Sequence, residues 1–541
     1  MHLDSASAWC WLFVCTGTVA LILVIVHLIH SLGTKRKVSL FYCWLGAIAV
    51  LGGAAAFFLP IAVNSGFAKD DDGSALRQAL LYTTGGLLGV VTLGETHRKN
   101  NQEKEKNEND HTRQVYAERR SRYTKAVEQL ANEKAAVRLG GIYTLVGLVD
   151  EWLADETLEH EEQHKEGQVI INNLCSYIRS PFPLADKIEE YEAYKALENL
   201  EKKEPEKLRE TESSRLQILL KRFKDSDEYE KPKDITTDYA KFHEEQDVRR
   251  TIFVEMSKRS SDLEGEGKVI KTVPGPWSDF DFDFSRAPIF YPLNAITIEK
   301  GNFSSAKFYS NADFSRTTFI QDADFSRTTF TQRADFRWAT FTQEANFRWA
   351  KFTQTAHFSW AKFTQTAHFT WAKFTQTAHF TRAKFTQKAN FSCAIFAQNA
   401  YFRGMTFTQT ASFSRATFIQ DADFRWATFT RTGYFRGTTF TQNADFGEAK
   451  FKEISPKFVD NNEDPDKTLR TRFAALAENQ EAHNFTVSKH SQPIPPGEAE
   501  LGGVKYRIPV GTVLFDPSSG ETSQPAKPLD KSNDGEEDKS E

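Results

Sequence analysis

Two histidines spaced four residues apart form the clearest catalytic pattern in this sequence. His160 and His164 enclose Glu161 in an H-E-x-x-H match. On a helix the two imidazoles would share one face and could bind zinc, and the glutamate could act as general base towards a zinc-bound water. The flanking stretch ETLEHEEQHKEGQ is charged on every side, and no third ligand is marked nearby, although a catalytic zinc needs three. We therefore interpret the match as a charged segment that binds no metal.

Other catalytic patterns are missing from the sequence. It has no glycine-rich phosphate loop, no G-x-S-x-G and no Cys/His metal spacing, so we expect no cofactor and no enzymatic activity. Five cysteines are too few for a disulfide framework in a chain of 541 residues, which fits a reducing compartment. A net charge of −5 implies no global electrostatic partner.

A short tandem repeat dominates the C-terminal half. From Gly301 to Phe451 phenylalanines follow one another in alternating steps of five and six residues, 28 in all. A step of five turns about 140° on an α-helix, so alternate phenylalanines would face opposite sides, and a helical supercoil is excluded. The residue two before each Phe is Ala in 22 of the 28 cases. Because residues i−2 and i share a face in a strand, each short strand directs one Phe and one small residue inward. We expect a solenoid core that includes Phe336, Phe341, Phe347, Phe352, Phe358, Phe363, Phe369, Phe374, Phe380 and Phe385.

Units such as Ala334-Asp335-Phe336-Arg337-Trp338 resemble pentapeptide repeats, A-(D/N)-(L/F)-x-x. The resemblance implies a right-handed quadrilateral β-helix with four short faces per coil. Every second face here carries a sixth residue, so one five-residue and one six-residue step together form a repeat of 11 residues. Two such repeats, 22 residues, make one coil, and the whole region makes about seven coils. At a strand spacing of ~4.8 Å the rod would be ~34 Å long. The segments 122–152, 171–181, 247–253 and 277–287 also resemble a membrane-anchored actinobacterial subgroup, which would make the protein bacterial.

In the family geometry the second residue after each Phe points outward, which places the tryptophans on the surface. Whole numbers of coils separate Trp338, Trp360 and Trp426, so they fall in one column, and Trp349 with Trp371 forms a second column on the opposite face. The same register stacks Lys351 with Lys373 and Lys362 with Lys384 on the two remaining faces. Exposed aromatic residues mixed with basic ones are typical of binding surfaces, although stacked rings can also simply protect strand edges. The nine residues are our candidate interaction surface.

Apolar runs near the N-terminus predict a membrane anchor in residues 1–97. Segments at about 8–30 and 40–63 are long enough to span a bilayer, and a shorter third run at 76–94 could span it or lie on it. Lys35, Arg36 and Lys37 should be cytoplasmic, whereas the loop with Asp70–Asp72 should be outside. This predicts a multi-pass protein of the cell membrane with its N-terminus outside and its later domains in the cytoplasm.

Four regions should follow the anchor. Residues 98–260 should form an α-helical domain with a charged insertion at 184–235, and residues 277–452 the β-helix, regular from 301. Residues 453–515 should cap the open coil, with a helix at 466–482 and a short β element at 504–515. The acidic tail, 516–541, should be disordered because it is rich in Pro, Ser and charge.

The leading hypothesis is a non-enzymatic, membrane-tethered scaffold whose solenoid binds an unidentified protein. One alternative is a topoisomerase-binding DNA mimic, an activity of some pentapeptide-repeat proteins. A mimic should be acidic, but residues 301–451 contain 18 Lys/Arg and 9 Asp/Glu, a net charge of 18 − 9 = +9. That sign would suit anionic lipid or nucleic acid instead. The other alternative is a zinc hydrolase that uses His160, Glu161 and His164.

Overall fold

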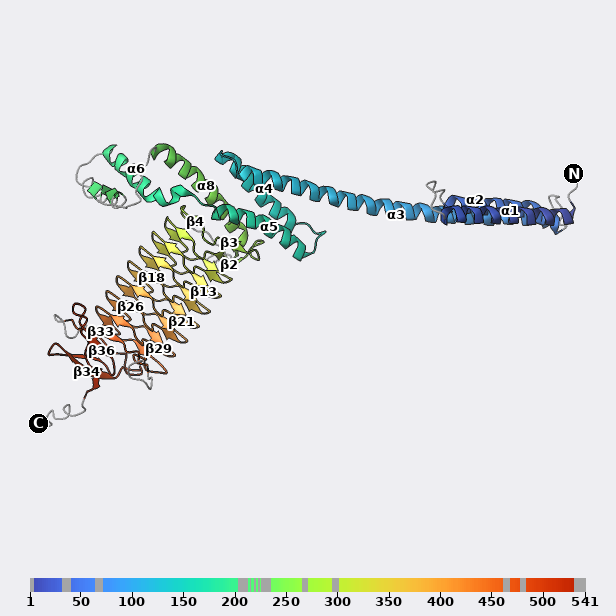
Figure 1. The fold of residues 1–541 in the computed structure, drawn as a ribbon. Coiled ribbons are helices and arrows are strands. Elements are labelled where there is room, and N and C mark those ends of the chain that lie inside the picture. The colour runs from blue at the N-terminus through green and yellow to red at the C-terminus, as the bar shows by residue number, and fades with distance from the viewer. Residues whose placement is uncertain are drawn as a thin grey trace. The chain divides into compact units, whose positions relative to one another are not determined.

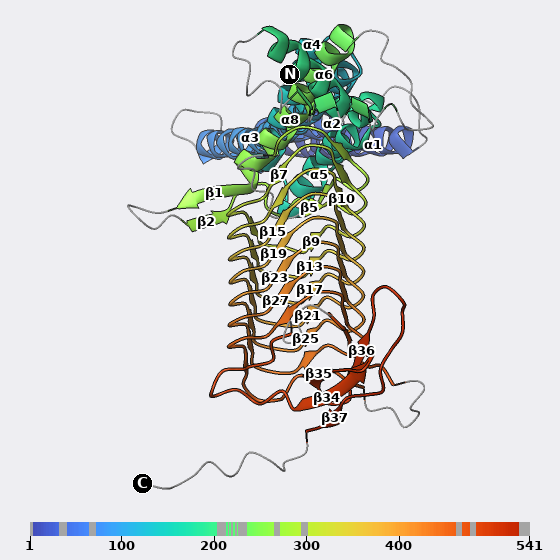
Figure 2. The same cartoon turned by 90° about the vertical axis from the view of Figure 1, so that its left-hand side faces the viewer.

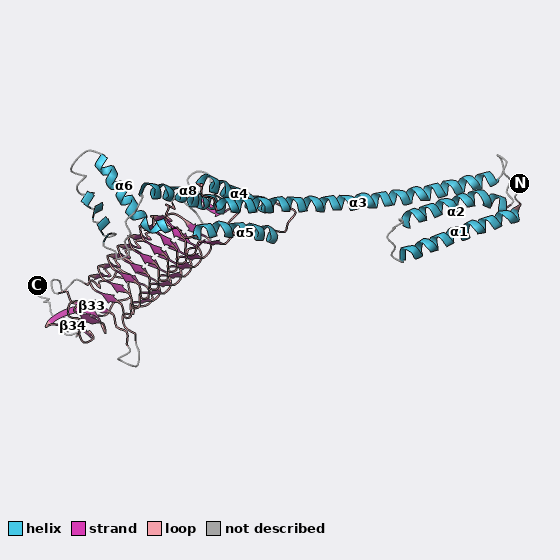
Figure 3. Cartoon of the chain, turned by 45° about the horizontal axis from the view of Figure 1, so that its top comes forward, coloured by secondary structure: helices cyan, strands magenta, loops and turns pink. Residues whose placement is uncertain are grey.

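A computed structural model describes most of the chain (Figure 1). The described residues are 4–31, 40–63, 72–202, 213–214, 216–217, 220–221, 224, 235–264, 271–293, 301–460, 468–476 and 483–529. The chain divides into two compact units, Met1–Arg120 and Ser121–Glu541. Figure 3 shows that strands gather in the second unit, whereas the first is helical.

Two apolar helices, α1 (Ser5–Ser31) and α2 (Leu40–Ala62), form an antiparallel hairpin in the first unit. The Ser5 hydroxyl and the Trp9 indole N–H both donate to the carbonyl of Ala62, at 2.7 and 3.1 Å. Within them, Ser5–Ile25 and Phe41–Ala62 are long and apolar enough to cross a membrane. The two predicted spans therefore exist as helices, and their length and composition alone support insertion.

The third helix, α3, runs unbroken over Asp72–Leu130 and contains the apolar run 76–94. Its first turns pack tightly against α2, because a Cβ built on Gly52 would clash with the Thr84 side chain. A third span remains a prediction. The loop residues Lys35, Arg36, Lys37, Asp70 and Asp71, on which the predicted orientation rests, lie outside the described residues.

The second unit begins with a helical domain. It contains the end of α3, then α4 (Ala135–Leu153), α5 (His160–Arg179), the short 3-10 helix η1 (Pro183–Lys187), α6 (Ile188–Lys202) and α8 (Ile235–Ser260). Gly141 lets α4 approach α3 closely, since a Cβ there would lie 2.8 Å from the Ala126 carbonyl oxygen. Part of the predicted solvated insertion is a packed element, because α6 buries Ile188 and Tyr191.

A β-solenoid of about seven turns follows, with four parallel sheets that we number as faces 1 to 4 in chain order (Figures 1 and 2). Face 1 holds β3 (Phe282–Asp283), β5 (Gly301–Asn302), β9 (Ala323–Asp324), β13 (Ala345–Asn346), β17 (Ala367–His368), β21 (Ala389–Asn390), β25 (Ala411–Ser412) and β29 (Gly433–Tyr434). Face 2 holds β4 (Pro288–Ile289), β6 (Lys307–Phe308), β10 (Thr329–Phe330), β14 (Lys351–Phe352), β18 (Lys373–Phe374), β22 (Ile395–Phe396), β26 (Thr417–Phe418), β30 (Thr439–Phe440), β33 (Arg472–Ala474) and β36 (Val513–Phe515). Face 3 holds β7 (Ala312–Asp313), β11 (Ala334–Asp335), β15 (Ala356–His357), β19 (Ala378–His379), β23 (Ala400–Tyr401), β27 (Ala422–Asp423) and β31 (Ala444–Asp445). Face 4 holds β8 (Thr318–Phe319), β12 (Thr340–Phe341), β16 (Lys362–Phe363), β20 (Lys384–Phe385), β24 (Thr406–Phe407), β28 (Thr428–Phe429) and β32 (Lys450–Phe451).

Phenylalanine rings fill the interior of the solenoid, as the repeat predicts. Each strand pairs with the strands one coil before and one coil after it, so that Phe352 lies beside Phe330 and Phe374. Stacked rings such as Phe352 and Phe374 lie parallel with centroids 4.8 Å apart. Phe347 and Phe358, which are half a coil apart, meet edge to face with centroids 5.4 Å apart. All ten predicted core phenylalanines are buried.

Met405 replaces the usual alanine two residues before Phe407, and its side chain is buried. The ring centroids of Phe385 and Phe407 lie 5.2 Å apart, compared with 4.5 Å for Phe363 and Phe385 one coil earlier. Phe314 and Phe336, each preceded by Ala two residues earlier, are also 5.2 Å apart, so local widening by Met405 stays a prediction.

Helices close the first coil of the solenoid. Phe253 of α8 packs on Phe284 at 4.5 Å, and Phe242 of α8 on Phe290 at 5.1 Å. The buried Arg249 guanidinium donates to Glu245 and to the carbonyl oxygens of Ile178 and Ser180. A hairpin of β1 (Ser261–Glu264) and β2 (Lys271–Pro274) connects α8 to the solenoid.

Strands rather than a helix close the last coil, which corrects our prediction for 466–482. Within that range, β33 lies beside β30 and places the Phe473 ring on Phe440 at 5.2 Å; residues 461–467 and 477–482 lie outside the described part. The predicted β element at 504–515 is present as β35 (Val504–Pro509) and β36, and β35 pairs with β34 (Pro496–Leu501).

The tail is also partly structured. Residues 516–529, which we expected to be disordered, include a bridge from Thr522 to Phe515 and the strand β37 (Lys527–Pro528), which pairs with β34. Residues 530–541 lie outside the described residues.

Candidate interaction surface

Tight turns after faces 1 and 3 determine what the solenoid presents outward. In each turn the N–H of the fourth residue donates to the first carbonyl, as from Ala350 to Phe347 at 3.2 Å. The third residue has a positive φ, the pattern of a type II turn, in which glycine is usual. The non-glycine residues in this position of the regular repeat are Ser305, Arg316, Arg327, Trp338, Trp349, Trp360, Trp371, Arg382, Cys393, Arg415, Trp426 and Glu448, with φ between 56° and 63°. Gly404 and Gly437 fill the two remaining positions.

All five predicted surface tryptophans occupy this position, and their exposed fractions lie between 43% and 52%. Trp349 and Trp371 lie on the corner between faces 1 and 2, and their rings are parallel with centroids 4.9 Å apart. Trp338, Trp360 and Trp426 lie on the corner between faces 3 and 4. The two columns therefore run along diagonally opposite corners of the rod.

Arginines flank the tryptophans on the corner between faces 3 and 4. The guanidinium of Arg316 lies 5.5 Å from the Trp338 ring, and that of Arg382 lies 4.7 Å from the Trp360 ring. Both arginines occupy the same turn position one coil away, so the adjacent pair Trp338 and Trp360 has a cation at each end. The sequence prediction placed Trp338 and Trp360 in one column correctly but gave no role to these arginines.

The four predicted lysines form two rows of exposed side chains. Lys351 lies beside Lys373 on face 2, and Lys362 lies beside Lys384 on face 4. Each lysine follows a turn residue by two positions and precedes a buried Phe. We define strip A as Trp349, Lys351, Trp371 and Lys373, and strip B as Trp360, Lys362, Arg382 and Lys384. Within the described part of the chain, none of the four lysines has an ion-pair partner.

Acidic residues are confined to the two ends of the solenoid. Residues 345–420 contain nine Lys and Arg and no Asp or Glu. Towards the N-terminal end, Asp335 accepts hydrogen bonds from Arg333 and Arg337 at 2.8 and 2.6 Å. Burial alone would raise the pKa of this carboxyl, but the arginine contacts outweigh it and hold the pKa below its usual range. Asp423 has similar contacts with Arg403 and Arg425, but burial outweighs them and raises its pKa to about 6. These acids pair with arginines and leave the central lysines without a carboxylate partner among the described residues.

Half-buried histidines line two faces of the same central segment. The rings of His357 and His379 stack on face 3 with centroids 4.6 Å apart, and Tyr401 continues the stack at 5.1 Å from His379. Burial lowers the pKa of His357 to about 4, helped by the nearby His379. His368 lies on face 1 and contacts Arg348 and Glu344. Burial likewise lowers the pKa of His368 and His379, so these imidazoles are neutral near pH 7.

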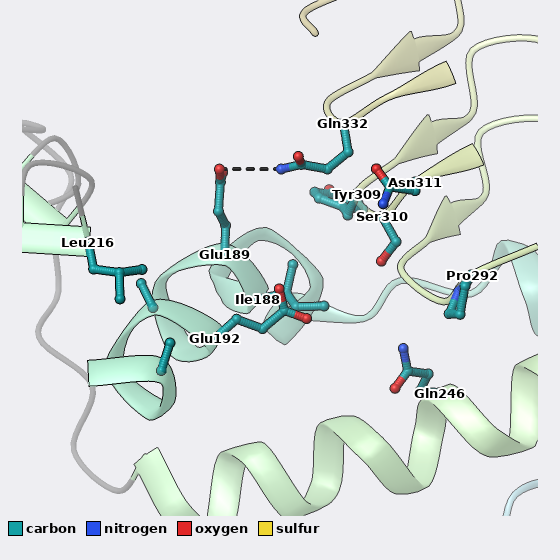
Figure 4. A pocket seen from close by; sticks show the side chains of 12 residues that line it. Ile188, Glu189, Glu192, Leu216, Gln246, Pro292, Tyr309, Ser310, Asn311 and Gln332 are labelled. Carbon is teal, nitrogen blue, oxygen red and sulfur yellow. Dashed lines mark hydrogen bonds between the residues drawn. The ribbon is translucent and has the colours of Figure 1, made fainter. Parts of the chain in front are cut away.

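A cavity of about 560 Å³ lies where α6 and α8 meet the first coils (Figure 4). Glu189, Glu192, Gln246, Tyr309 and Gln332 contribute polar groups, and Glu189 accepts a hydrogen bond from Gln332 at 3.3 Å. Burial raises the pKa of Glu192, and the charge of Glu189 adds to the shift. The sequence does not predict this cavity, because its walls come from segments far apart in the chain that share no motif.

The H-E-x-x-H residues lie on the first turns of α5. The His164 ring stacks on Phe280 at 4.7 Å, and its Nε2 lies 3.2 Å from the Asp279 carbonyl oxygen, while His160 is exposed. No group of three or more His, Cys, Asp or Glu suited to a metal ion occurs among the residues that the structure describes.

Comparison with known proteins identifies the repeat. Residues 296–337 and 402–450 match the family model of pentapeptide repeats. The eight residues of strips A and B lie between these two stretches. No curated protein and no solved structure matches the chain. Membership of a membrane-anchored actinobacterial subgroup is not supported by any match.

Proposed function

Starting from a solenoid of pentapeptide repeats, we propose that the protein is a non-enzymatic scaffold tethered to the cell membrane. In this proposal α1, α2 and the apolar run 76–94 of α3 anchor the chain, and the solenoid presents its outer surface to a partner in the cytoplasm. The observation that carries the proposal is the rigid outward display of Trp and Lys in coil register, above a core of stacked phenylalanines.

Physical reasons favour a display role. A short-strand solenoid offers a long, regular side surface, and its coils hold side chains at fixed spacing. Tryptophan and arginine are enriched in binding hot spots, and the lysines add positive charge beside them. A DNA-mimic role remains disfavoured by the excess of basic residues, and a zinc-hydrolase role by the packing of His164 on Phe280.

Site-specific crosslinking in living cells tests the proposal. A photocrosslinking residue is placed at Gln354 or Gln376, which lie on the corner after the lysines of strip A, and adducts are identified by mass spectrometry. We expect a discrete adduct at these positions and none at Lys489 in the C-terminal cap. Adducts of equal yield at all three positions, or none at any, would contradict a specific role for the solenoid surface. Stoichiometric zinc in the purified protein, lost in His160→Ala with His164→Ala, would favour the hydrolase.

A further inference from the structure

We propose that strips A and B bind single-stranded nucleic acid, with lysines on the phosphates and tryptophans against the bases. The inference rests on the proposed function, because it names a partner class for the same surface.

Charge is the first argument. Residues 345–420 carry nine basic residues and no acidic one. Lys351 and Lys373 lie on neighbouring strands in register, as do Lys362 and Lys384, and like charges directly opposite repel. A polyanion that places a phosphate near each row relieves this repulsion and releases its own counterions. Paired acids such as Asp335 and Asp423 lie outside the segment, so they do not compete for these lysines.

The tryptophans supply the second argument. Each lysine of strip A follows a Trp by two residues, so that a row of lysines on face 2 runs beside the stacked tryptophans of the corner. Trp349 covers one face of the Trp371 ring, and the next residue in the column is Cys393, whose side chain is much smaller. A base can therefore continue the stack on the Cys393 side of Trp371. Such a combination of aromatic platforms and basic residues is how proteins bind single strands without sequence preference.

The placement of the strips favours a flexible strand over a flat or rigid polyanion. Strip A lies on the corner between faces 1 and 2, and strip B on the diagonally opposite corner. A bilayer or a duplex is straight on the scale of the rod and can contact one strip at a time. A single strand can bend round faces 2 and 3, or round faces 4 and 1, and contact both.

Binding of labelled oligonucleotides to the full chain tests the proposal. The protein is held in nanodiscs of neutral phosphatidylcholine. Fluorescence anisotropy measures binding of a labelled dT or U oligomer of about 16 nucleotides, which is the upper end of the site size of one small single-strand-binding domain. The charge variant carries Lys351→Gln, Lys362→Gln, Lys373→Gln and Lys384→Gln. Its matched control carries Lys450→Gln, Lys452→Gln, Lys457→Gln and Lys489→Gln, four exposed lysines outside the central segment.

We expect the charge variant to bind on the order of tenfold more weakly, with a shallower dependence of affinity on salt. The matched control should keep its affinity within about twofold of the wild type and should keep the same dependence on salt, because its lysines do not contact the phosphates. Equal weakening in the two variants would show that net charge alone attracts the oligomer and would overturn the proposal.

The aromatic contribution is tested separately. Trp349→Ala with Trp371→Ala should weaken binding roughly 5- to 150-fold for each stacked base, whereas the two Trp→Phe changes should retain most of it. Full binding by the alanine variant would overturn the stacking part.

Two competitors separate the partner classes. The two competitors are polyglutamate and vesicles with about one third phosphatidylserine. If either one displaces the labelled oligomer as effectively as unlabelled dT does, the assignment to nucleic acid is overturned. If the wild-type chain does not bind the oligonucleotide but still forms the crosslinked protein adduct, this inference alone is rejected. If the wild-type chain forms no adduct, the proposed function is rejected.

Discussion

The indole rings of Trp349 and Trp371 lie parallel with centroids 4.9 Å apart, although both residues have a φ of 62°. Left-handed backbone costs a non-glycine residue about 1–2 kcal/mol, and an aromatic pair contributes about 0.5–1.5 kcal/mol beyond its buried area. Stacking along the corner therefore offsets part of the backbone strain that presents the rings.

Replacement of Trp349 by glycine and by alanine should separate these two effects. Ala keeps the strain and loses the ring contact, whereas Gly loses both, so Trp349→Gly should be more stable than Trp349→Ala by about 1 kcal/mol. Hydrogen exchange of the amides in the adjoining coils measures the difference. Gly404→Ala is the converse control and should destabilise its coil, because Gly404 has a φ of 63°. Equal stability of the Gly and Ala variants would show that the turn tolerates L-residues without strain.

Phe374→Ala should open a cavity in the middle of the rod. Phe374 is fully buried and stacks on Phe352 and Phe396 at 4.8 Å. We expect a loss of ~3–5 kcal/mol, which hydrogen exchange should detect as reduced protection of the flanking coils. Gln376→Ala, an exposed position in the same coil, should change protection little. A small effect of Phe374→Ala would mean that the ring stack closes over the gap.

Met405→Ala should be far milder than an ordinary buried Met→Ala change. The buried methionine occupies a place that alanine fills in most coils, so its removal loses apolar burial but relieves overpacking. The opposing effects should leave a net change within about 1 kcal/mol, below the usual 2–5 kcal/mol. A crystal structure of the variant should bring the Phe385 and Phe407 rings closer than 5.2 Å. An unchanged separation would show that Met405 does not overpack this coil.

Acid should weaken the centre of the rod through its histidines. The folded pKa of His357, about 4, lies below its ordinary 6.5, so the unfolded chain binds more protons between these pH values. Stability is therefore complete above about pH 6.5 and falls as the pH drops towards 4. Arg333, Asp335 and Arg337 face the ring and are charged across most of this window.

His357→Asn with His379→Asn should flatten that dependence, because asparagine occupies the equivalent place on face 1 at Asn346 and Asn390. Thermal unfolding at a series of pH values, compared with the wild-type chain, gives the measurement. His490→Asn, at an exposed position, should leave the pH profile unchanged. A profile of the double variant that overlays the wild type would exclude these imidazoles as the cause.

Reporter fusions test the orientation of the anchor. The positive-inside rule places the loop of Lys35–Lys37 in the cytoplasm and that of Asp70–Asp72 outside. A reporter fused after Glu541 should be active only in its cytoplasmic form, and one inserted after Lys69 only in its external form. External activity of both fusions would place the solenoid outside and show that residues 76–94 do not cross the membrane. External activity of the C-terminal fusion alone would invert the orientation.

Sequence alone predicts the solenoid well because its period fixes the neighbours of every residue. Once two repeats make a coil, the pairing of Lys351 with Lys373 and the stacking of Trp349 on Trp371 follow directly. The cavity walled by Glu192 and Gln246 has no such period, since unrelated helices and coils form it. The C-terminal helix was mispredicted because Arg472–Ala474 pairs with the open edge of β30, and this tertiary contact overrides helix propensity.

The interior of the rod repeats with every half coil, whereas its faces repeat only with every full coil. An insertion or deletion of a single repeat, half a coil in length, would leave the alternation of phenylalanine and alanine intact, so the core alone would accept it. Everything downstream would turn by half a coil, however, so β33 would still pair with β30 but both would continue face 4 of the coils upstream of the change. The C-terminal cap and the two strips therefore set the phase of the rod, and only changes of whole coils keep surface and cap aligned.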